Sequence, residues 1–323
     1  MRIGYFLSCE EYGPEQIISQ ARLAEQAGFD CLWISDHFHP WNGEQANSPL
    51  VWSMIGALSQ VTSLPITTAV TCPTVRIHPA IIAQAAATSA RLTGGSFVLG
   101  VGSGEALNEH IIGTRWPDAT VRLSMLAEAI DVMRELWAGD FVNHHGEHYQ
   151  VENARLYTLP DQPPPIYVSG FGPASAALAG RKGDGYVTTK PDAELIRTFR
   201  EHGGEGKPMQ AGYKVCWSAD RPAALRTAHS LWANEALPGE LAQVLPSPVH
   251  FEQASGLVTE DMVADQITCG DDVEAHVAAF RPFAEAGFDD IHISQIGAAR
   301  SETSAEGFFE FYRDKVLPRL REL

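Results

Sequence analysis

Residues 2–36 read RIGYFLSCEEYGPEQIISQARLAEQAGFDCLWISD and contain one complete strand–helix–strand unit. Arg2–Ser8 and Phe29–Asp36 are short runs rich in aliphatic and aromatic residues, as is typical of buried strands. Between them, Glu15–Ala27 carries apolar residues at helical spacing and stops before Gly28, a good helix C-cap. The stretch therefore predicts two parallel strands that are joined by a helical crossover.

The same unit recurs along the rest of the chain. Further strands are predicted at Leu64–Val70, Ser96–Gly102, Pro165–Gly170, Gly185–Thr189, Gln210–Ser218 and Asp289–Gly297, and helices at Pro79–Leu92, Ala119–Ala138, Pro173–Lys182, Asp271–Gly287 and Ser304–Arg321. Alternating strands and helices indicate an α/β protein, either an open doubly wound sheet or a closed barrel. Eight strands in 323 residues favour a (β/α)8 TIM barrel with insertions, as one domain over residues 1–323.

Two segments are predicted to be insertions. Asp140–Thr158 alternates polar and apolar residues and is expected to be a hairpin that turns at His145-Gly146. The pattern His-x-x-Glu-His at residues 144–148 also matches an inverted zinc-protease motif, but that motif requires a helix, and Gly146 favours the hairpin. No metal site is therefore predicted. The second insertion is Asn234–Asp265, which is punctuated by proline and glycine.

The bulk composition excludes several function classes. A net charge of -17 disfavours binding to nucleic acid or to anionic lipid. The chain begins with a strand-like run, so no signal peptide is expected, and no apolar run is long enough to span a membrane. Its five cysteines are widely spaced and contain no Cys-x-x-Cys, which indicates reduced thiols and a cytoplasmic protein.

The glycine-rich stretch Gly100-Val-Gly-Ser-Gly-Glu-Ala-Leu-Asn108 follows a predicted strand. It is similar to a dinucleotide-binding fingerprint, but the position of the third glycine is occupied by Glu105. The glycines still indicate a close backbone approach to a ligand. Glu105 lies at the C-terminal end of a strand, where barrels carry their catalytic groups. The alternative is a tight turn with an exposed glutamate.

Two other strand ends carry candidate site residues. Ser35-Asp-His-Phe-His-Pro-Trp41 offers His37 as a base near neutral pH and Trp41 as an apolar surface. The alternative for this cluster is a helix cap with a core tryptophan. Ser169-Gly-Phe-Gly-Pro-Ala-Ser175 places two glycines and a proline at a helix start, which favours an anion site or, alternatively, an ordinary turn.

Taken together, these motifs resemble the luciferase-like barrel family that uses the deazaflavin coenzyme F420. The resemblance is carried by residues 35–41 and 100–109, by Thr71-Cys-Pro-Thr-Val-Arg76 and by His78-Pro-Ala-Ile-Ile-Ala-Gln84, with Gly180-Arg-Lys-Gly-Asp-Gly185 as a later match. It runs nearly end to end and is weakest over Glu201–Asp265. Within the family, the branch of glucose-6-phosphate dehydrogenases and secondary alcohol dehydrogenases is the most similar.

The resemblance implies a homodimer that binds coenzyme F420 at the C-terminal mouth of the barrel. It implies a bulge with a non-prolyl cis peptide at Ala69-Val70, behind the deazaflavin ring. The positions that match contacts with this ring or its surroundings are Asp36, Ala69, Val70, Cys72, Ser103, Gly104 and Asn108. The positions that match the loop around the phosphate-bearing tail are Ser169, Gly170, Gly172, Pro173 and Ala174.

The resemblance also implies an enzyme that moves a hydride from a CH–OH group to the deazaflavin. It implies His37 as the base, Glu105 as the acid beside the reduced ring and Trp41 as a wall of the reacting centre, although these roles can be permuted. Candidate substrate-binding residues are Glu10, Thr189 and Lys190.

The sequence departs from the sugar-phosphate branch at its phosphate pocket. Thr189-Lys190 matches it in part, whereas Glu252-Gln-Ala254 and Ala264-Asp-Gln266 occupy the regions of a later basic pair. This favours a neutral alcohol or an unphosphorylated sugar over a sugar 6-phosphate, with Lys190 and Lys214 still available for a different phosphate site. Three alternatives remain: a reductase of a ketone, imine or alkene, an FMN-dependent monooxygenase, and a barrel that only carries the deazaflavin.

Overall fold

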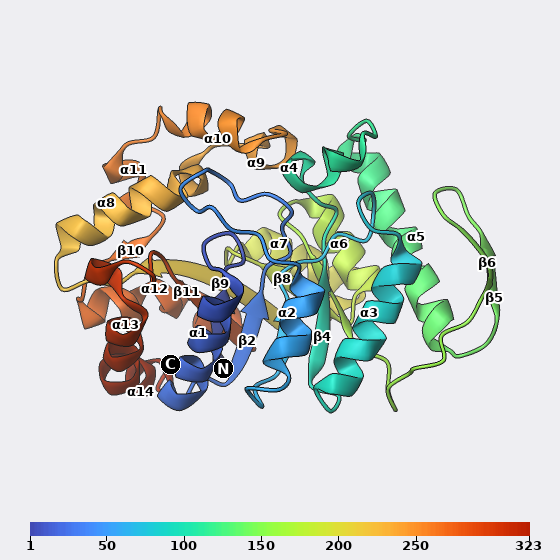
Figure 1. The fold of residues 1–323 in the computed structure, drawn as a ribbon, viewed down its shortest axis with the longest axis horizontal. Coiled ribbons are helices and arrows are strands. Elements are labelled where there is room, and N and C mark those ends of the chain that lie inside the picture. Colours follow the sequence, from blue (N-terminus) through green and yellow to red (C-terminus); the bar gives the residue numbers. More distant parts are fainter.

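The computed structural model describes all of residues 1–323, and its main feature is a ring of parallel strands (Figure 1). Each strand of the ring is separated from the next along the chain by at least one helix. The strands are β1 Arg2–Leu7, β2 Cys31–Ile34, β3 Ile66–Thr68, β4 Phe97–Val101, β7 Ile166–Ser169, β8 Gly185–Thr188, β9 Met209–Cys216 and β11 Asp290–Gln295.

The ring is closed. β1 lies between β2 and β11, and the pairing of β8 with β9 joins the two ends of the sheet. All of these pairs are parallel; Gly4, for example, is opposite Cys31 on one side and His292 on the other. The predicted (β/α)8 barrel is therefore confirmed, and the predicted strand ends lie within two residues of the observed ones. β10 (Thr268–Cys269) adds to the end of β9.

Helices pack around the outside of the barrel and bury one face each. On α1, Ile17, Ala21 and Ala24 are fully buried at the three- and four-residue spacing of a helix, and α1 ends at Gly28 with φ of 87°. The other helices of this layer are α2 Val51–Leu58, α3 Pro79–Leu92, α5 Ala119–Trp137, α6 Pro173–Lys182, α7 Ala193–Phe199, α12 Val273–Ala286 and α13 Ala305–Phe311, and α1 itself is Pro14–Ala27.

Aromatic side chains fill the barrel interior. Phe6 and Trp33 pack edge to face at 5.6 Å between ring centroids, and Tyr167 and Val187 belong to the same buried cluster. Below them, His292 stacks on Trp33 at 4.4 Å. The interior is therefore solid at this level, which restricts a ligand to the C-terminal mouth.

Two insertions decorate the barrel. β5 (Val142–His145) and β6 (Gln150–Ala154) pair antiparallel as the predicted hairpin, which projects at the side of the molecule in Figure 1. The second insertion folds into short helices that lie with α8 across the top of Figure 1, where the barrel strands end. The helices of the insertion are α9 Leu241–Val244, α10 Pro248–Ser255 and α11 Glu260–Ala264. They lie beside α8 (Arg221–Trp232) and near the short helix α4 (Ala106–Glu109), which are not part of the insertion.

The predicted helix Ser304–Arg321 is not continuous. α13 ends at Phe311, and residues 312–316 form a wider π-type turn before the short helix α14 (Leu317–Leu320). Pro318 has no N–H to donate to the carbonyl of the preceding turn, which accounts for the interruption. The helices α2, α7 and α8 and the short helices of the insertion, α9, α10 and α11, were not predicted from the sequence.

A membrane-spanning helix must combine sufficient length with an apolar composition, and none of the helices in this structure does so. All five cysteines are free thiols, and Cys9, Cys31, Cys72 and Cys216 are buried.

Candidate active site

The loop that follows β2 places a histidine against a buried glutamate at the barrel mouth. His37 Nε2 lies 3.2 Å from Glu10 Oε1, and both side chains are less than a tenth exposed. Trp41 packs beside this histidine, with 5.0 Å between ring centroids. The structure thus brings together three residues that the sequence analysis singled out from two separate strand ends.

Glu10 is held as a carboxylate. Burial raises its pKa, but the charge of His37 and hydrogen bonds from Ser35 and Ser8 outweigh that effect and leave the pKa below its ordinary value. The Ser8 and Ser35 hydroxyls both donate to Glu10 Oε2, at 2.8 and 2.6 Å. Glu10 Oε1 therefore stays free to face His37.

Asn108 orients the histidine ring. Its Oδ1 accepts hydrogen bonds from the backbone N–H groups of Phe38 and His39, so its Nδ2 is directed at His37 Nδ1, 3.1 Å away. His37 Nδ1 also lies 3.1 Å from the carbonyl oxygen of His39, so this nitrogen is engaged within the protein, and Nε2 is the nitrogen that faces Glu10 Oε1. A neutral imidazole ring next to the Glu10 carboxylate can take up one proton.

A second ionic cluster lies beneath this pair. The Arg76 guanidinium is 2.9 Å from Asp36 Oδ1 and 3.3 Å from Glu109 Oε1, and Thr71 donates to Asp36 Oδ2. All three charged side chains are at least nine-tenths buried. Burial raises the pKa of Glu109 even though Arg76 opposes that shift. Both oxygens of Asp36 are thus engaged within the protein, and neither Arg76 nor Glu109 was among the predicted site residues.

The loop after β4 carries Glu105 at the N-terminus of α4. Glu105 is half-buried and makes no hydrogen bond with the pair of His37 and Glu10. Beside it, Gly104 has φ of 83°, and a Cβ there would lie 2.5 Å from Cys72 Sγ. Ser103 is half-buried, and Cys72 is buried against Thr74. The predicted loop residues therefore lie together, with Glu105 at the rim.

The predicted cis peptide bond between Ala69 and Val70 is present at the end of β3. Both side chains are half-buried and pack on the aromatic cluster of the interior. Across from them, a Cβ on Gly102 would lie only 2.7 Å from Val70 Cγ2, so only a glycine lets the end of β4 approach Val70 this closely. Ala69 and Val70 thus form a partly open apolar floor above the aromatic cluster.

The loop after β7 ends at the N-terminus of α6. No side chain caps this helix, its first turn contains no acidic residue, and Pro173 and Ala174 are exposed. Gly170 is buried, and a Cβ there would lie 2.9 Å from the backbone N of Ala176. Open N–H groups and a helix dipole without a competing carboxylate favour an anion at this end, beside Ser169 and Gly172.

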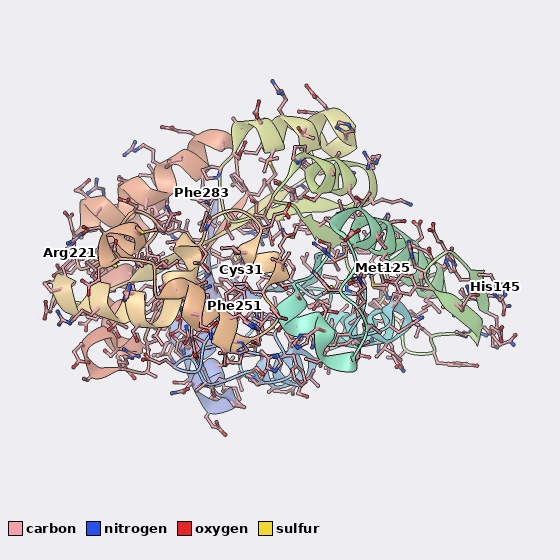
Figure 2. All side chains as sticks on the ribbon, turned by 90° about the horizontal axis from the view of Figure 1, so that it is seen from above. Cys31, Met125, His145, Arg221, Phe251 and Phe283 are labelled. Carbon is pink, nitrogen blue, oxygen red and sulfur yellow. The ribbon has the colours of Figure 1, made fainter.

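The remaining predicted residues lie on the other side of the mouth. Thr189 is half-buried after β8, and the neighbouring Lys190 is exposed and takes part in no ion pair. Trp41 packs edge to face on Phe251 of α10, at 5.0 Å. In Figure 2, which is seen from above, Phe251 lies over the middle of the molecule, whereas His145 lies at its far edge. The insertion therefore covers part of the mouth and leaves the hairpin remote from it.

The segment after Trp41 is tied to this cover. The side-chain amides of Asn42 and Gln45 both donate to the Leu231 carbonyl oxygen, at 2.9 and 2.8 Å. Gly43 N donates to Glu252 Oε1, and Glu44 pairs with Arg300 at 3.2 Å. We call residues 41–45 the clasp segment, since it holds the β2 loop against α8, the insertion and the loop that follows β11.

Glu11 is a further buried carboxyl group that the sequence analysis missed. Its two oxygens accept hydrogen bonds from Trp232 Nε1 and from Gly297 N, the latter at 2.9 Å. Burial raises its pKa from an ordinary value of 4.5 to about 7. Its partners lie more than two hundred residues away in the sequence, so no local pattern could reveal them.

The raised pKa of Glu11 predicts a pH-dependent stability. The folded state favours the protonated carboxyl group, so its stabilising contribution is complete below pH 4.5 and is lost as the pH rises through about 7. The loss amounts to at most about 3 kcal/mol. Urea unfolding of wild type and Glu11→Gln at pH 5, 6, 7 and 8 checks this prediction. The variant lacks the titrating group, so its free energy of unfolding is expected to fall less with rising pH than that of the wild type. Parallel curves for the two proteins would contradict the assignment.

Comparisons with known proteins agree with this geometry. A model of the luciferase-like monooxygenase family matches residues 1–290. F420-dependent glucose-6-phosphate dehydrogenases from Amycolatopsis mediterranei and Kribbella flavida are 33% identical over 336 residues and 35% identical over 337 residues, covering 100% of this chain and 99% of each relative.

Solved structures extend the comparison. An F420-dependent secondary alcohol dehydrogenase in complex with an F420-acetone adduct superposes with a TM-score of 0.89 at 32% identity, over 99% of both chains. A coenzyme F420 dependent tetrahydromethanopterin reductase from Methanopyrus kandleri superposes with a TM-score of 0.77 at 18% identity, over 99% of both chains, which bears on the fold alone.

Proposed function

The chain belongs to the luciferase-like monooxygenase family, and we propose that it is a dehydrogenase that transfers a hydride from a small hydroxyl-bearing substrate to coenzyme F420. The observation that carries the proposal is the pair of His37 and Glu10 at the barrel mouth, which can take up the proton of a hydroxyl group. Relatives that match end to end are named F420-dependent dehydrogenases, and they act on a sugar phosphate or on secondary alcohols.

The mouth fits this cofactor on two observations. Ala69 and Val70 form a half-buried apolar floor on the aromatic cluster, and this floor suits a flat ring. The uncapped N-terminus of α6 suits a phosphate-bearing tail. We assign the ring surroundings to Asp36, Ala69, Val70, Cys72, Ser103, Gly104 and Asn108, and the tail to Ser169, Gly170, Gly172, Pro173 and Ala174.

The protein's own part in the reaction is to hold the substrate and to remove a proton. When bound, coenzyme F420 supplies a ring carbon that accepts the hydride of the carbinol C–H bond. The hydroxyl proton passes to the pair of His37 and Glu10, so that the substrate becomes a carbonyl compound and the pair becomes neutral. We assign the base to His37, a rim acid to Glu105 and a wall beside the reacting carbon to Trp41.

Replacement of Gly172 by aspartate tests the assignment of the tail. A Cβ at this position meets nothing within 4 Å and the backbone is extended, so the fold is expected to keep its stability. The new carboxylate would occupy the end of α6, and we expect the affinity for F420 to fall about tenfold or more. Fluorescence titration measures it, and Gly172→Asn is the matched neutral control. Equal F420 affinities of the two variants would show that the phosphate-bearing tail does not bind at the N-terminus of α6.

The cofactor itself is tested by anaerobic titration of the purified protein with oxidised F420 and, separately, with FMN. Secondary alcohols, sugars and sugar 6-phosphates are then added while the deazaflavin absorbance is followed. Micromolar F420 binding and bleaching by one substrate class would support the dehydrogenase. Preference for FMN would favour a monooxygenase instead, and F420 binding with turnover only from the reduced cofactor to a ketone, imine or alkene would favour a reductase.

We also propose that the chain is a single cytoplasmic domain that forms homodimers. The strand ring closes between β1 and β11, which supports one domain over residues 1–323. Five free cysteines suit a reducing compartment.

The proposed dimer contact rests on an exposed apolar surface. Phe141 and Tyr157 are exposed and line a surface hollow with Arg155 beside them, and such apolar surface is typical of subunit contacts. Sedimentation velocity measures the oligomeric state.

A further inference from the structure

The inner face of β9 carries one charged side chain into the mouth of the barrel. Gln210 Oε1 accepts a hydrogen bond from Trp33 Nε1 inside the barrel, and a Cβ at position 212 would touch the Trp33 ring. Since alternate residues of a strand share a face, Lys214 points to the same interior, one level higher. Its Nζ lies 5.8 Å from the ring centroid of Phe6, whereas Tyr213 packs outward against Phe280.

Lys214 is enclosed by a charge, a ring and a hydroxyl. Its Nζ lies 2.9 Å from Glu235 Oε1 and 4.1 Å from the centroid of the Trp232 ring, and the lysine side chain is only 14% exposed. Its register partner on β11 is Ser294, which is fully buried and whose hydroxyl has no partner among the protein atoms. A cationic ammonium group, a carboxylate and a hydroxyl group without a partner therefore lie together at one point of the mouth.

This point is linked to the proposed base. Trp232, which lies under Lys214, donates its indole N–H to Glu11, and Glu11 is the neighbour of Glu10 in the chain. Trp41, which packs beside His37, also packs against the buried cluster that contains Trp232, so Lys214 and His37 border the same part of the mouth. We propose that Lys214 and Glu235 form a specificity-determining subsite for a second hydroxyl group, and that the substrate is a neutral polyol or an unphosphorylated sugar.

The chemistry of Lys214 and Glu235 decides whether a neutral or an anionic substrate fits this subsite. A hydroxyl group both accepts and donates, so it satisfies the Lys214 ammonium and the Glu235 carboxylate at once. A phosphate dianion only accepts, and it would meet Glu235 as a like charge. The ring of Phe6, whose centroid lies 5.8 Å from Lys214 Nζ, adds an apolar face for the C–H surface of a polyol beside the two charged groups. This inference rests on the proposed function and narrows its substrate class.

The test compares four probes at saturating F420: myo-inositol, D-glucose, glucose 6-phosphate and 2-propanol. In Lys214→Met, which keeps the packing of the stem against Trp232, we expect the ratio of kcat/KM for the polyol or sugar over 2-propanol to fall about 10- to 100-fold, through KM. Glu235→Gln is expected to lower the same ratio about tenfold. Lys315→Met is the matched control, since this lysine also lies over a ring, that of Phe311 at 5.6 Å, but is exposed at the C-terminal end.

Each outcome separates this inference from the proposed function. A wild type that reduces F420 with 2-propanol but ignores both neutral polyhydroxylated probes overturns the subsite and leaves the dehydrogenase intact. A preference for glucose 6-phosphate that is abolished by Lys190→Met but not by Lys214→Met also overturns it, in favour of an anion site at Thr189 and Lys190. Failure to bind F420 at all overturns the proposed function instead. Calorimetric titration of the F420 complex with myo-inositol, in wild type and Lys214→Met, gives a binding readout without turnover.

Discussion

Replacement of His37 by alanine is expected to lower kcat about 10²- to 10⁴-fold, the usual effect of removing a general base. The side chain is 9% exposed and its Nε2 faces Glu10 Oε1 at 3.2 Å, so its removal leaves the glutamate without its partner at the mouth. The affinity for F420 is expected to change little, since the proposed floor and tail sites are formed by other residues. Single-turnover reduction of F420 measures the chemical step, and fluorescence titration measures the affinity.

The neighbouring histidine provides the control. His39 Nδ1 bonds the carbonyl oxygen of Leu107, and its side chain makes no bond with Glu10. His39→Ala is therefore expected to retain most of the turnover, whereas Glu10→Gln is expected to lose much of it. Wild-type turnover in His37→Ala would take His37 out of the mechanism and leave Glu10 or Glu105 as the group that accepts the proton.

Replacement of Arg76 by methionine is expected to lower the free energy of unfolding by about 3–5 kcal/mol, because it leaves two buried carboxylates without their cation. Arg76 is only 7% exposed, and Asp36 and Glu109 are even less so. The three residues join the β2 loop, the β3 loop and α4, so the affinity for F420 is expected to fall as well. Urea unfolding at pH 7, followed by fluorescence, measures the loss.

A surface ion pair gives the matched control. Arg134 lies 2.8 Å from Asp184, but both side chains are more than a third exposed, and Arg134→Met is expected to cost at most about 1 kcal/mol. The double variant Arg76→Met/Glu109→Gln is expected to recover part of the loss, because it removes one of the two orphaned charges. If Arg76→Met costs no more than Arg134→Met, water screens the buried cluster and the argument fails.

The barrel could be predicted because its signals are local. Each strand is a short apolar run bounded by turn residues. The long helices have recognisable boundary residues, such as Pro79 in the first turn of α3. Helices with weaker boundaries were missed, among them α2, which begins after Leu50 without a side-chain cap. The cis bond at Ala69-Val70 was expected only from family resemblance, since no propensity rule indicates it.

The residues at the site were predicted better than their connections. Local motifs identified His37, Trp41 and Glu105, but the pairing of His37 with Glu10 crosses from one strand end to another. The ion pairs of Arg76 join residues 33 and 40 positions apart, and Trp232 reaches Glu11 across 221 positions. A parallel barrel brings all of its strand ends to one rim, and only the closed ring determines which of them are neighbours.

The clasp segment has a consequence for laboratory evolution of substrate range. Residues 42–45 are joined to Leu231, Glu252 and Arg300 by hydrogen bonds and an ion pair, so two walls of the mouth are encoded far apart in the gene yet fit only each other. A chimaera that imports residues 231–300 from a homologue without its own clasp segment breaks these contacts together. Productive libraries will therefore exchange the two segments as a matched set, with crossover points inside the barrel strands.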